Sequence, residues 1–220
     1  FLVIGMGYYG KHLARELVKL GNEVVVVDRD AEIINGLAEE FTDAYTGDCR
    51  NPHIVKSLGV KNFDACFVAT GDNFQSSLEI TSQLYENGAN YIVSKASDDM
   101  QVKFLMKLGA NEVIFPEHDM ADRLAQRFNM HNVFDYIEIA KNLVVYETGI
   151  DEAWIGKSIV ELDIRKKHQI NVLAIARADG VTVTAEPGYI FEEGDHIFVL
   201  GKKKDDKVSK LAKTLKGKKK

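Results

Sequence analysis

The sequence lacks the features of a membrane-spanning or disulfide-bonded protein. Its longest apolar runs extend over about five residues, whereas a helix that crosses a bilayer needs about 20. Only two cysteines occur, Cys49 and Cys66, without a CxxC pair, so neither a disulfide framework nor a zinc site is expected. In a chain of 220 residues with 45% hydrophobic and 28% charged content, these absences indicate a globular protein of a reducing cytoplasm.

Charge is unevenly distributed along the chain. The net charge is -5, but residues 202–220 hold ten lysines and two aspartates, which gives this tail +8 and leaves -13 elsewhere. A basic tail could contact nucleic acid or an anionic membrane surface. We favour a solvated helix end, and no nucleic-acid partner is expected because the acidic body repels it. Since the sequence opens at Phe1 within an apolar run, we also expect a few residues to precede it.

Short apolar runs alternate with amphipathic segments in the first half of the chain. In the segments between the runs, apolar residues recur at helical spacing, as at Leu13, Leu17 and Leu20. This alternation predicts an α/β fold, a Rossmann-like doubly wound parallel sheet. The six expected strands are residues 1–4, 24–27, 43–45, 65–69, 91–93 and 112–115.

The character of the sequence changes after a helix that is expected to open at Pro116 and run to about Met130. From Leu143 the runs shorten and turn residues multiply, and Ala178-Asp179-Gly180 predicts a hairpin turn. We expect a small α+β domain with three or four strands, which pairs with a second copy because its core is marginal. The predicted parts are a nucleotide-binding domain over 1–131, a connecting segment over 132–142, a C-terminal domain over 143–201 and a basic tail over 202–220.

The strongest motif is Gly5-Met6-Gly7-Tyr8-Tyr9-Gly10, which follows the first expected strand and opens a helix. Gly5 suits a tight turn, Gly7 lets phosphates approach the backbone, and Gly10 permits close helix–strand packing. Asp28 ends the second strand at the distance expected for a carboxylate that binds ribose hydroxyls. The motif therefore predicts an adenine-containing nucleotide, and Asp28 disfavours a 2′-phosphate although Arg29 is adjacent.

Polar turns follow the third and fourth expected strands, at the sheet edge where such folds bind ligands. Asp48 of Thr46-Gly47-Asp48 is expected to meet the adenine amino group. In Thr70-Gly71-Asp72-Asn73, the last two residues either reach the second ribose or a terminal phosphate, or cap a helix. Lys95 either pairs with phosphate or is solvated. The whole predicted cofactor-binding set is Gly5, Met6, Gly7, Tyr8, Tyr9, Gly10, Asp28, Arg29, Asp48, Cys49, Thr70, Gly71, Asp72, Asn73 and Lys95.

No catalytic constellation is found in the sequence. None of the six histidines is placed at an expected cofactor edge with a paired acid, as hydride chemistry would require. We therefore expect a regulatory protein and not an enzyme. Two alternatives stay open: a small NAD-dependent oxidoreductase, and an adenine-nucleotide sensor that acts on an unrelated partner.

These motifs, together with residues 115–120, Ile164-Arg165 and Ala185-Glu186-Pro187-Gly188, resemble those of the regulator-of-potassium-conductance family, the cytosolic gating subunits of Ktr/Trk potassium uptake systems. The resemblance extends over nearly all of residues 1–201. It implies a Rossmann domain that binds ATP, ADP or NAD(H), a dimeric TrkA-C-like domain, and homodimers assembled into an octameric ring. It also implies a membrane potassium-translocating partner and a cytoplasmic location at the inner face of the cell membrane.

The resemblance also implies roles for single residues. Glu117 corresponds to an acidic residue that binds a divalent cation, Ca²⁺ or Mg²⁺, between paired subunits in some members. A helix-dipole carboxylate is the alternative for Glu117. A second ligand, cyclic di-AMP, is implied at Ile164, Arg165, Asn171, Val172 and Pro187, where an apolar dimer seam is equally expected. Tyr8 departs from the arginine of ATP-responsive members, which weakens ATP over ADP discrimination and favours NAD(H).

Overall fold

The computed structural model describes residues 1–70, 73–129, 133–140, 143–168 and 170–202. It divides the chain into two compact units, Phe1–His118 and Asp119–Lys220. We call them the first unit and the second unit. Helix α6 (Pro116–Asn129) begins in the first unit and ends in the second.

The first unit contains a six-stranded sheet, with the strand order β3-β2-β1-β4-β5-β6 and parallel pairing at each junction. The crossover between β3 and β4 reverses the direction of strand addition, as in doubly wound sheets. The predicted fold class is confirmed. The strands are β1 (Leu2–Ile4), β2 (Val25–Asp28), β3 (Asp43–Thr46), β4 (Cys66–Val68), β5 (Ile92–Lys95) and β6 (Glu112–Ile114).

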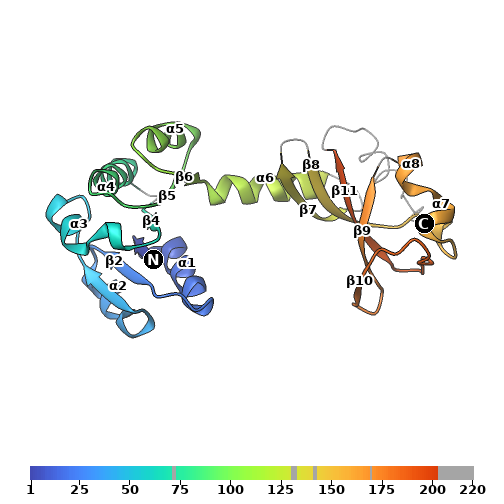
Figure 1. Ribbon diagram of the computed structural model, residues 1–220, viewed down its shortest axis with the longest axis horizontal. Helices are drawn as coiled ribbons and strands as arrows, with labels where there is room; N and C mark the ends of the chain where they lie inside the picture. The colour runs from blue at the N-terminus through green and yellow to red at the C-terminus, as the bar shows by residue number, and fades with distance from the viewer. Residues whose placement is uncertain (71–72, 130–132, 141–142, 169, 203–220) are drawn as a thin grey trace. The chain divides into compact units, whose positions relative to one another are not determined.

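Helices cover both faces of this sheet (Figure 1). One core lies under α1 and α2 and includes Ala14 and Ile34; the other lies under α3, α4 and α5 and includes Leu84 and Leu105. Because helices cover both faces of the sheet, apolar residues occupy consecutive positions in the central strands and do not alternate with polar ones, as around the fully buried Val26. The helices are α1 (Tyr8–Lys19), α2 (Ala31–Asn35), α3 (Pro52–Leu58), α4 (Phe74–Glu86) and α5 (Asp99–Lys107), with the 3₁₀ turns Ala38–Glu40 and Val60–Asn62.

Four of these five helices begin at a side chain that accepts a hydrogen bond from the backbone of the first turn. The capping residues are Asp30, Asn51, Asn73 and Asp98, which are residue types favoured at this position. Helix α1 differs, because Gly7 is its N-cap and has no side chain. Its first backbone N–H groups are therefore left without an intrachain cap.

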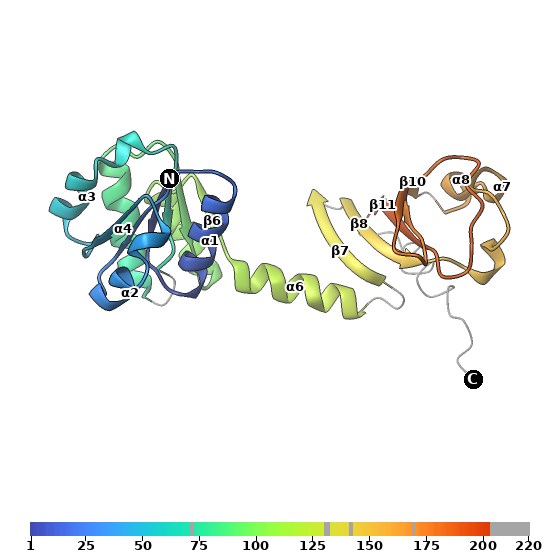
Figure 2. The same cartoon turned by 90° about the horizontal axis from the view of Figure 1, so that it is seen from below.

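The second unit contains a five-stranded antiparallel sheet in the order β10-β9-β11-β8-β7. One face packs on a core that includes Tyr146, Trp154, Ile175 and Ile197, and the short helices lie beside it (Figure 2). The elements are β7 (Val133–Ala140), β8 (Leu143–Gly149), a 3₁₀ turn (Glu152–Trp154), α7 (Ile159–Leu162), α8 (Ile164–His168), β9 (Asn171–Ala176), β10 (Thr182–Thr184) and β11 (His196–Lys202).

One expectation for the second unit requires correction. The connecting segment expected over 132–142 contains strand β7, which pairs with β8 and is the fifth strand of the sheet, whereas residues from 143 onward supply four described strands, within the three or four expected there. Strand β7 is an edge strand with exposed Ile137 and Ile139, so no buried apolar run marked it in the sequence. The expected hairpin is present, with β9 and β10 antiparallel around residues 178–180.

In the described part of the chain, no helix combines the length and the hydrophobicity that a bilayer-spanning segment requires.

Candidate functional site

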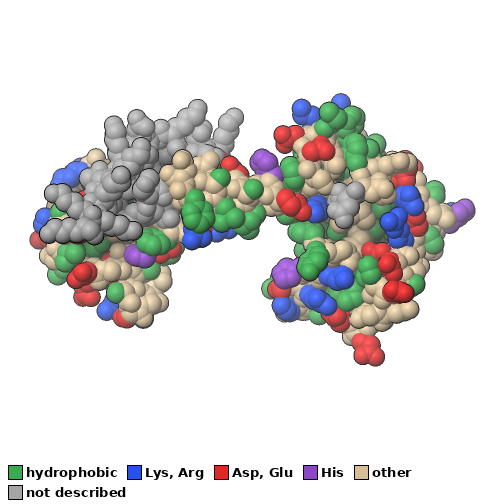
Figure 3. All heavy atoms as spheres, turned by 180° about the vertical axis from the view of Figure 1, so that it is seen from behind, with side chains coloured by type: hydrophobic (Ala, Val, Ile, Leu, Met, Phe, Trp, Pro, Cys, Tyr) green, Lys and Arg blue, Asp and Glu red, His purple; other side chains and the backbone are tan. Residues whose placement is uncertain are grey.

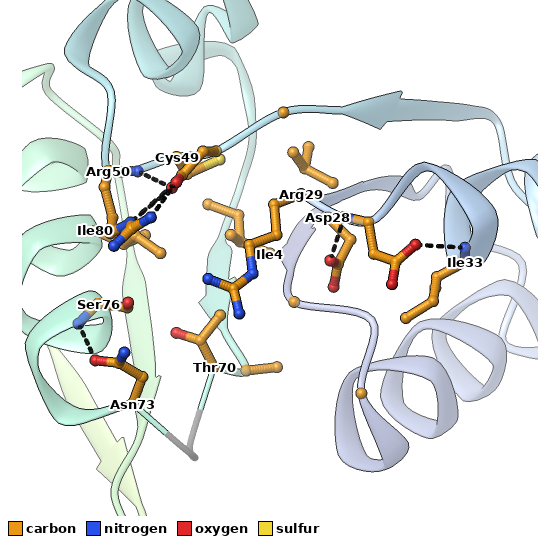
Figure 4. A pocket seen from close by; sticks show the side chains of 17 residues that line it. Ile4, Asp28, Arg29, Ile33, Cys49, Arg50, Thr70, Asn73, Ser76 and Ile80 are labelled. Carbon is orange, nitrogen blue, oxygen red and sulfur yellow. Dashed lines mark hydrogen bonds and ion pairs between the residues drawn. The ribbon is translucent and has the colours of Figure 1, made fainter.

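A cavity of about 280 Å³ opens at the carboxyl edge of β1, β2, β3 and β4 (Figure 4). The first strands of the sheet end there, at the crossover point where ligands of doubly wound folds bind. The cavity is close in size to the smaller ligand pockets of proteins, which measure about 300 Å³. Its lining is Ile4, Gly5, Gly7, Val27, Asp28, Arg29, Asp30, Ile33, Gly47, Asp48, Cys49, Arg50, Ala69, Thr70, Asn73, Ser76 and Ile80.

Gly5 and Gly10 hold the turn and the following helix against each other. Gly5 has a φ of +95°, a left-handed conformation that favours glycine. A Cβ on Gly10 would lie 1.9 Å from the carbonyl oxygen of Gly5, so only glycine fits without a backbone shift. These two glycines are explained by the fold itself, as predicted for a tight turn and close packing.

Gly7 is different, because neither its conformation nor its neighbours require glycine. Its φ is -67°, which other residues adopt readily, and a Cβ would have no heavy atom within 4 Å. The space beside it borders the cavity and the uncapped first turn of α1. This open space, next to free N–H groups and a positive helix end, suits an anionic phosphate.

Asp28 connects the glycine loop to the second strand. Its Oδ2 accepts a hydrogen bond from the Met6 backbone N–H at 2.6 Å, and its Oδ1 accepts from the Asp30 backbone N–H at 2.9 Å. A carboxylate offers about four acceptor positions, so two remain for hydroxyl donors. The loop is thereby fixed around a side chain that still has capacity for a ribose.

Asp48 forms a paired contact with Arg50 on the wall formed after β3. Two nitrogens of the Arg50 guanidinium donate to the Asp48 carboxylate at 2.5 and 3.0 Å, and these hydrogen bonds lower the pKa of Asp48 below its ordinary value. Both side chains are 38% exposed. An adenine amino group would therefore meet a carboxylate that is already shared with an arginine.

Cys49 and Thr70 give the cavity two weakly polar wall positions. Cys49 is buried, and burial raises the pKa of its thiol to about 12, so it is a neutral wall residue. Thr70 Oγ1 is buried without a hydrogen-bond partner in the described structure. A buried hydroxyl of this kind is uncommon in native proteins, and a bound ligand with a polar atom there would satisfy it.

Asn73 serves as the N-cap of α4, the alternative that the sequence left open, because its Oδ1 accepts from the Ser76 backbone N–H at 3.0 Å. It also lines the cavity. Gly71 and Asp72 lie outside the described residues.

Five of the predicted binding residues are not part of the cavity lining: Met6, Tyr8, Tyr9, Gly10 and Lys95. Met6 is fully buried in the core, whereas Tyr8 is fully exposed. The Lys95 Nζ lies 2.5 Å from Glu117 Oε1 and 5.7 Å from the centre of the Tyr9 ring. Lys95 is thus paired with a carboxylate, whereas the sequence left phosphate binding and solvation open.

Glu117 lies in the first turn of α6, and its hydrogen bond with Lys95 lowers the pKa of its carboxyl group. Its side chain is 62% exposed. No cluster of three or more histidine, cysteine or acidic residues that could hold a metal ion is found in the described parts of this single chain. A cation shared between two copies stays a prediction.

The residues expected at a second ligand site are divided between core and surface. Ile164 is buried in the core of the second unit and Val172 packs against it. Arg165, Asn171 and Pro187 are exposed. Ile164 is thus a core residue within one copy of the chain.

The sequence interpretation missed several members of the cavity wall. Arg50 and Asp30 each lie two residues from a predicted carboxylate, and this short distance was the available signal. The apolar Ile33 and Ile80, and the small Ser76, come from helices α2 and α4. Their positions depend on how these helices pack on the sheet, which no local motif specifies.

The geometry fits a nucleotide in three respects. Gly7 leaves open space at an uncapped helix start, Asp28 retains acceptor positions, and Thr70 presents an unsatisfied buried hydroxyl. The residues that would hold it are Gly5 and Gly7 at the phosphates, Asp28 at the ribose, and the Asp48 wall at the base. Such a nucleotide would supply charge and hydrogen-bonding groups, and the chain would supply the shaped pocket.

Two family models match the chain: the TrkA-N domain over residues 1–116 and the TrkA-C domain over residues 143–214. The chain is 35% identical over 201 residues to the Ktr system potassium uptake protein C of Bacillus subtilis (strain 168), covering 91% of each chain. It is 34% identical over 207 residues to the Ktr system potassium uptake protein A of the same organism, covering 94% of this chain and 93% of that one.

A solved structure of the GsuK channel bound to NAD is similar in fold, with a TM-score of 0.68 over the whole of this chain. The identity is 17%, and this chain spans 40% of that channel's length, so the likeness bears on the fold alone. The two family models and the identity to both Ktr proteins agree. The chain therefore belongs to the TrkA-N/TrkA-C family, which includes the Ktr system potassium uptake proteins.

Proposed function

We propose that this protein is a nucleotide-binding regulatory subunit that controls a membrane potassium channel or transporter. The observation that carries the proposal is the cavity of the first unit, with open space at Gly7 beside the uncapped start of α1. The identity to the Ktr proteins supports potassium uptake as the regulated process. The cavity is the site where the regulatory nucleotide would bind.

The ligand we propose is NAD(H) or an adenine nucleotide such as ADP or ATP. Asp28, with two acceptor positions left, suits free ribose hydroxyls and disfavours a 2′-phosphate. Tyr8 is fully exposed and presents a neutral hydroxyl in place of a cation, so little extra affinity for a third phosphate is expected.

The role we propose is regulatory and not catalytic. Each carboxylate of the wall already accepts hydrogen bonds from other groups of the chain: Asp28 from the glycine loop, Asp30 from the first turn of α2, and Asp48 from Arg50. The thiol of Cys49 is held neutral by burial. A regulatory ligand must bind one conformation better than another, and a tenfold difference corresponds to about 1.4 kcal/mol per site.

We propose that the protein acts as a homodimer within an octameric ring, in the cytoplasm at the inner face of the membrane, below the subunit that translocates potassium. Helix α6 supports self-association, because its apolar side chains Met120, Leu124 and Phe128 are 53%, 42% and 78% exposed. Figure 3 shows hydrophobic atoms gathered along this helix. Exposed apolar stripes of this kind mark protein–protein contacts.

Two finer ligand proposals concern other parts of the chain. A divalent cation, Ca²⁺ or Mg²⁺, would bind Glu117 between two copies, and it would have to displace the Lys95 ammonium. Cyclic di-AMP would bind the second unit near Arg165, Asn171 and Pro187. Calorimetric titration of each ligand into the purified protein tests both, and binding that survives Glu117→Gln or Arg165→Ala respectively contradicts them.

The main test combines binding with a functional measurement. Purified protein is titrated with NADH, ADP and ATP, and then combined with a Ktr-type membrane subunit in vesicles loaded with potassium. We expect nucleotide binding in the first assay and a nucleotide-dependent potassium flux in the second. Oxidation of NADH with a small substrate would establish the oxidoreductase alternative, and binding without any effect on flux would favour a sensor for another partner.

A further inference from the structure

Arg29 stands apart from the other charged residues of the cavity wall. Asp28 accepts two backbone N–H groups, Asp30 caps α2, and Asp48 is paired with Arg50. Arg29 has neither a hydrogen bond nor an ion pair in the described part of the chain. It is therefore a free guanidinium group at the edge of a ligand cavity.

The side chain of Arg29 extends into the cavity and not away from it. Figure 4 shows its guanidinium between Ile4 and Thr70, with Asp28 on one side and Arg50 on the other. The charge of Arg29 contributes to lowering the pKa of Asp48, after the larger effect of Arg50. The hydrogen bonds of Asp28 and Asp48 are directed to other groups, so the Arg29 guanidinium is available to a ligand in the cavity.

The charge distribution decides which ligand group Arg29 would meet. A phosphate attached to the ribose would lie beside the Asp28 carboxylate, which repels it. The phosphates of a nucleotide would instead lie at Gly7 and the start of α1, where no carboxylate occurs in the first helical turn. The remaining part is the base, for which the wall offers the apolar side chains Ile33 and Ile80.

We propose that Arg29 is a specificity-determining residue that stacks its guanidinium plane on the purine base of the bound nucleotide. This inference rests on the proposed function, because it concerns the ligand of the same cavity. A guanidinium is planar and weakly hydrated, and it stacks on aromatic faces better than an ammonium does. Arg29 thereby favours a large aromatic base over a ligand that has only sugar and phosphate.

The test uses Arg29→Lys and Arg29→Gln in the full chain, with Arg15→Gln as the control. Arg15 lies on α1 outside the cavity lining and is paired with Glu40, so Arg15→Gln removes one positive charge and a surface ion pair without changing the cavity wall. Calorimetric titration with ADP, NADH and NADPH gives the affinities, and thermal unfolding checks that each variant is folded. Ribose 5-phosphate, as a competitor of ADP, measures the part of binding that needs no base.

Both Arg29 variants are expected to weaken ADP and NADH binding by about three- to fivefold, the range of an exposed cation–π contact. Arg15→Gln should bind ADP and NADH with wild-type affinity, and the affinity for ribose 5-phosphate should be the same in the Arg29 variants as in the wild type. If Arg29→Lys keeps wild-type affinity for ADP and NADH, the charge of Arg29 matters and its stacking does not. A loss of affinity confined to NADPH would show that Arg29 contacts a 2′-phosphate. Unchanged affinities in both variants would show that Arg29 is solvated. Each result overturns the proposal. If the wild-type protein binds no nucleotide, the proposed function fails as well.

Discussion

Replacing Gly10 and Gly7 separately by alanine should distinguish a structural glycine from a ligand-binding one within a single motif. A Cβ on Gly10 would approach the Gly5 carbonyl oxygen to 1.9 Å and the Ala69 Cβ to 3.2 Å. The first contact is with backbone, so α1 must move away from the turn after β1. Overpacking of this kind costs about 3 kcal/mol, which corresponds to a fall in Tm of roughly 10 °C for a unit of this size.

Gly7→Ala has a different expected outcome. Its Cβ would have no heavy atom within 4 Å, and the loss of a favourable N-cap residue is offset by the lower entropy of the unfolded chain. We expect stability within about 1 kcal/mol of the wild type. Affinity for ADP or NADH should fall at least tenfold, about 1.4 kcal/mol, because the methyl group fills the space that suits a phosphate.

Thermal unfolding and calorimetric titration of both variants decide between the two roles. A Gly10→Ala protein with wild-type Tm would refute the close contact between α1 and the turn. A Gly7→Ala protein that loses as much stability as Gly10→Ala would show that Gly7 is structural. If Gly7→Ala binds nucleotides with wild-type affinity, the phosphate position at α1 is wrong.

The remaining predictions concern the ribose carboxylate, the Lys95–Glu117 pair and the cysteines. Asp28→Asn should lower NADH affinity about tenfold through loss of charged hydrogen bonds, with a smaller loss for NADPH; equal losses by titration would contradict the ribose role. Because Lys95 lowers the pKa of Glu117, the pair's contribution is fully present above the ordinary pKa of 4.5 and is lost as pH falls through the lower folded value. Glu117→Gln should cost about 1 kcal/mol at pH 7, discounted for exposure, and should flatten the pH dependence of urea unfolding below pH 4.5; an unaltered profile would show that the pair contributes nothing. Burial raises the pKa of both Cys49 and Cys66 to about 12, so iodoacetamide should label the native protein slowly at pH 8 and the urea-unfolded protein quickly, and rapid native labelling by mass spectrometry would contradict their burial.

Local patterns were sufficient to predict the first unit and the centre of its site. The glycine loop, the apolar strands and Asp28 are separated by short stretches, and each follows a strand whose carboxyl end must lie at one sheet edge. That edge therefore brings Gly5, Asp28, Asp48 and Thr70 together, as the cavity lining confirms. Their roles toward a ligand remain predictions.

The parallel sheet and the position of its glycine turn were predictable from local sequence, because buried strands and tight turns have strong local requirements. The pairing of Lys95 with Glu117 was set by tertiary packing, because it joins the end of β5 to the first turn of α6, whereas Asp48 and Arg50 lie two residues apart in one turn. The edge strand β7 was likewise decided by pairing with β8 and not by its own pattern. Side-chain contacts depend on three-dimensional neighbours, and for that reason the free Arg29 was visible only in the folded chain.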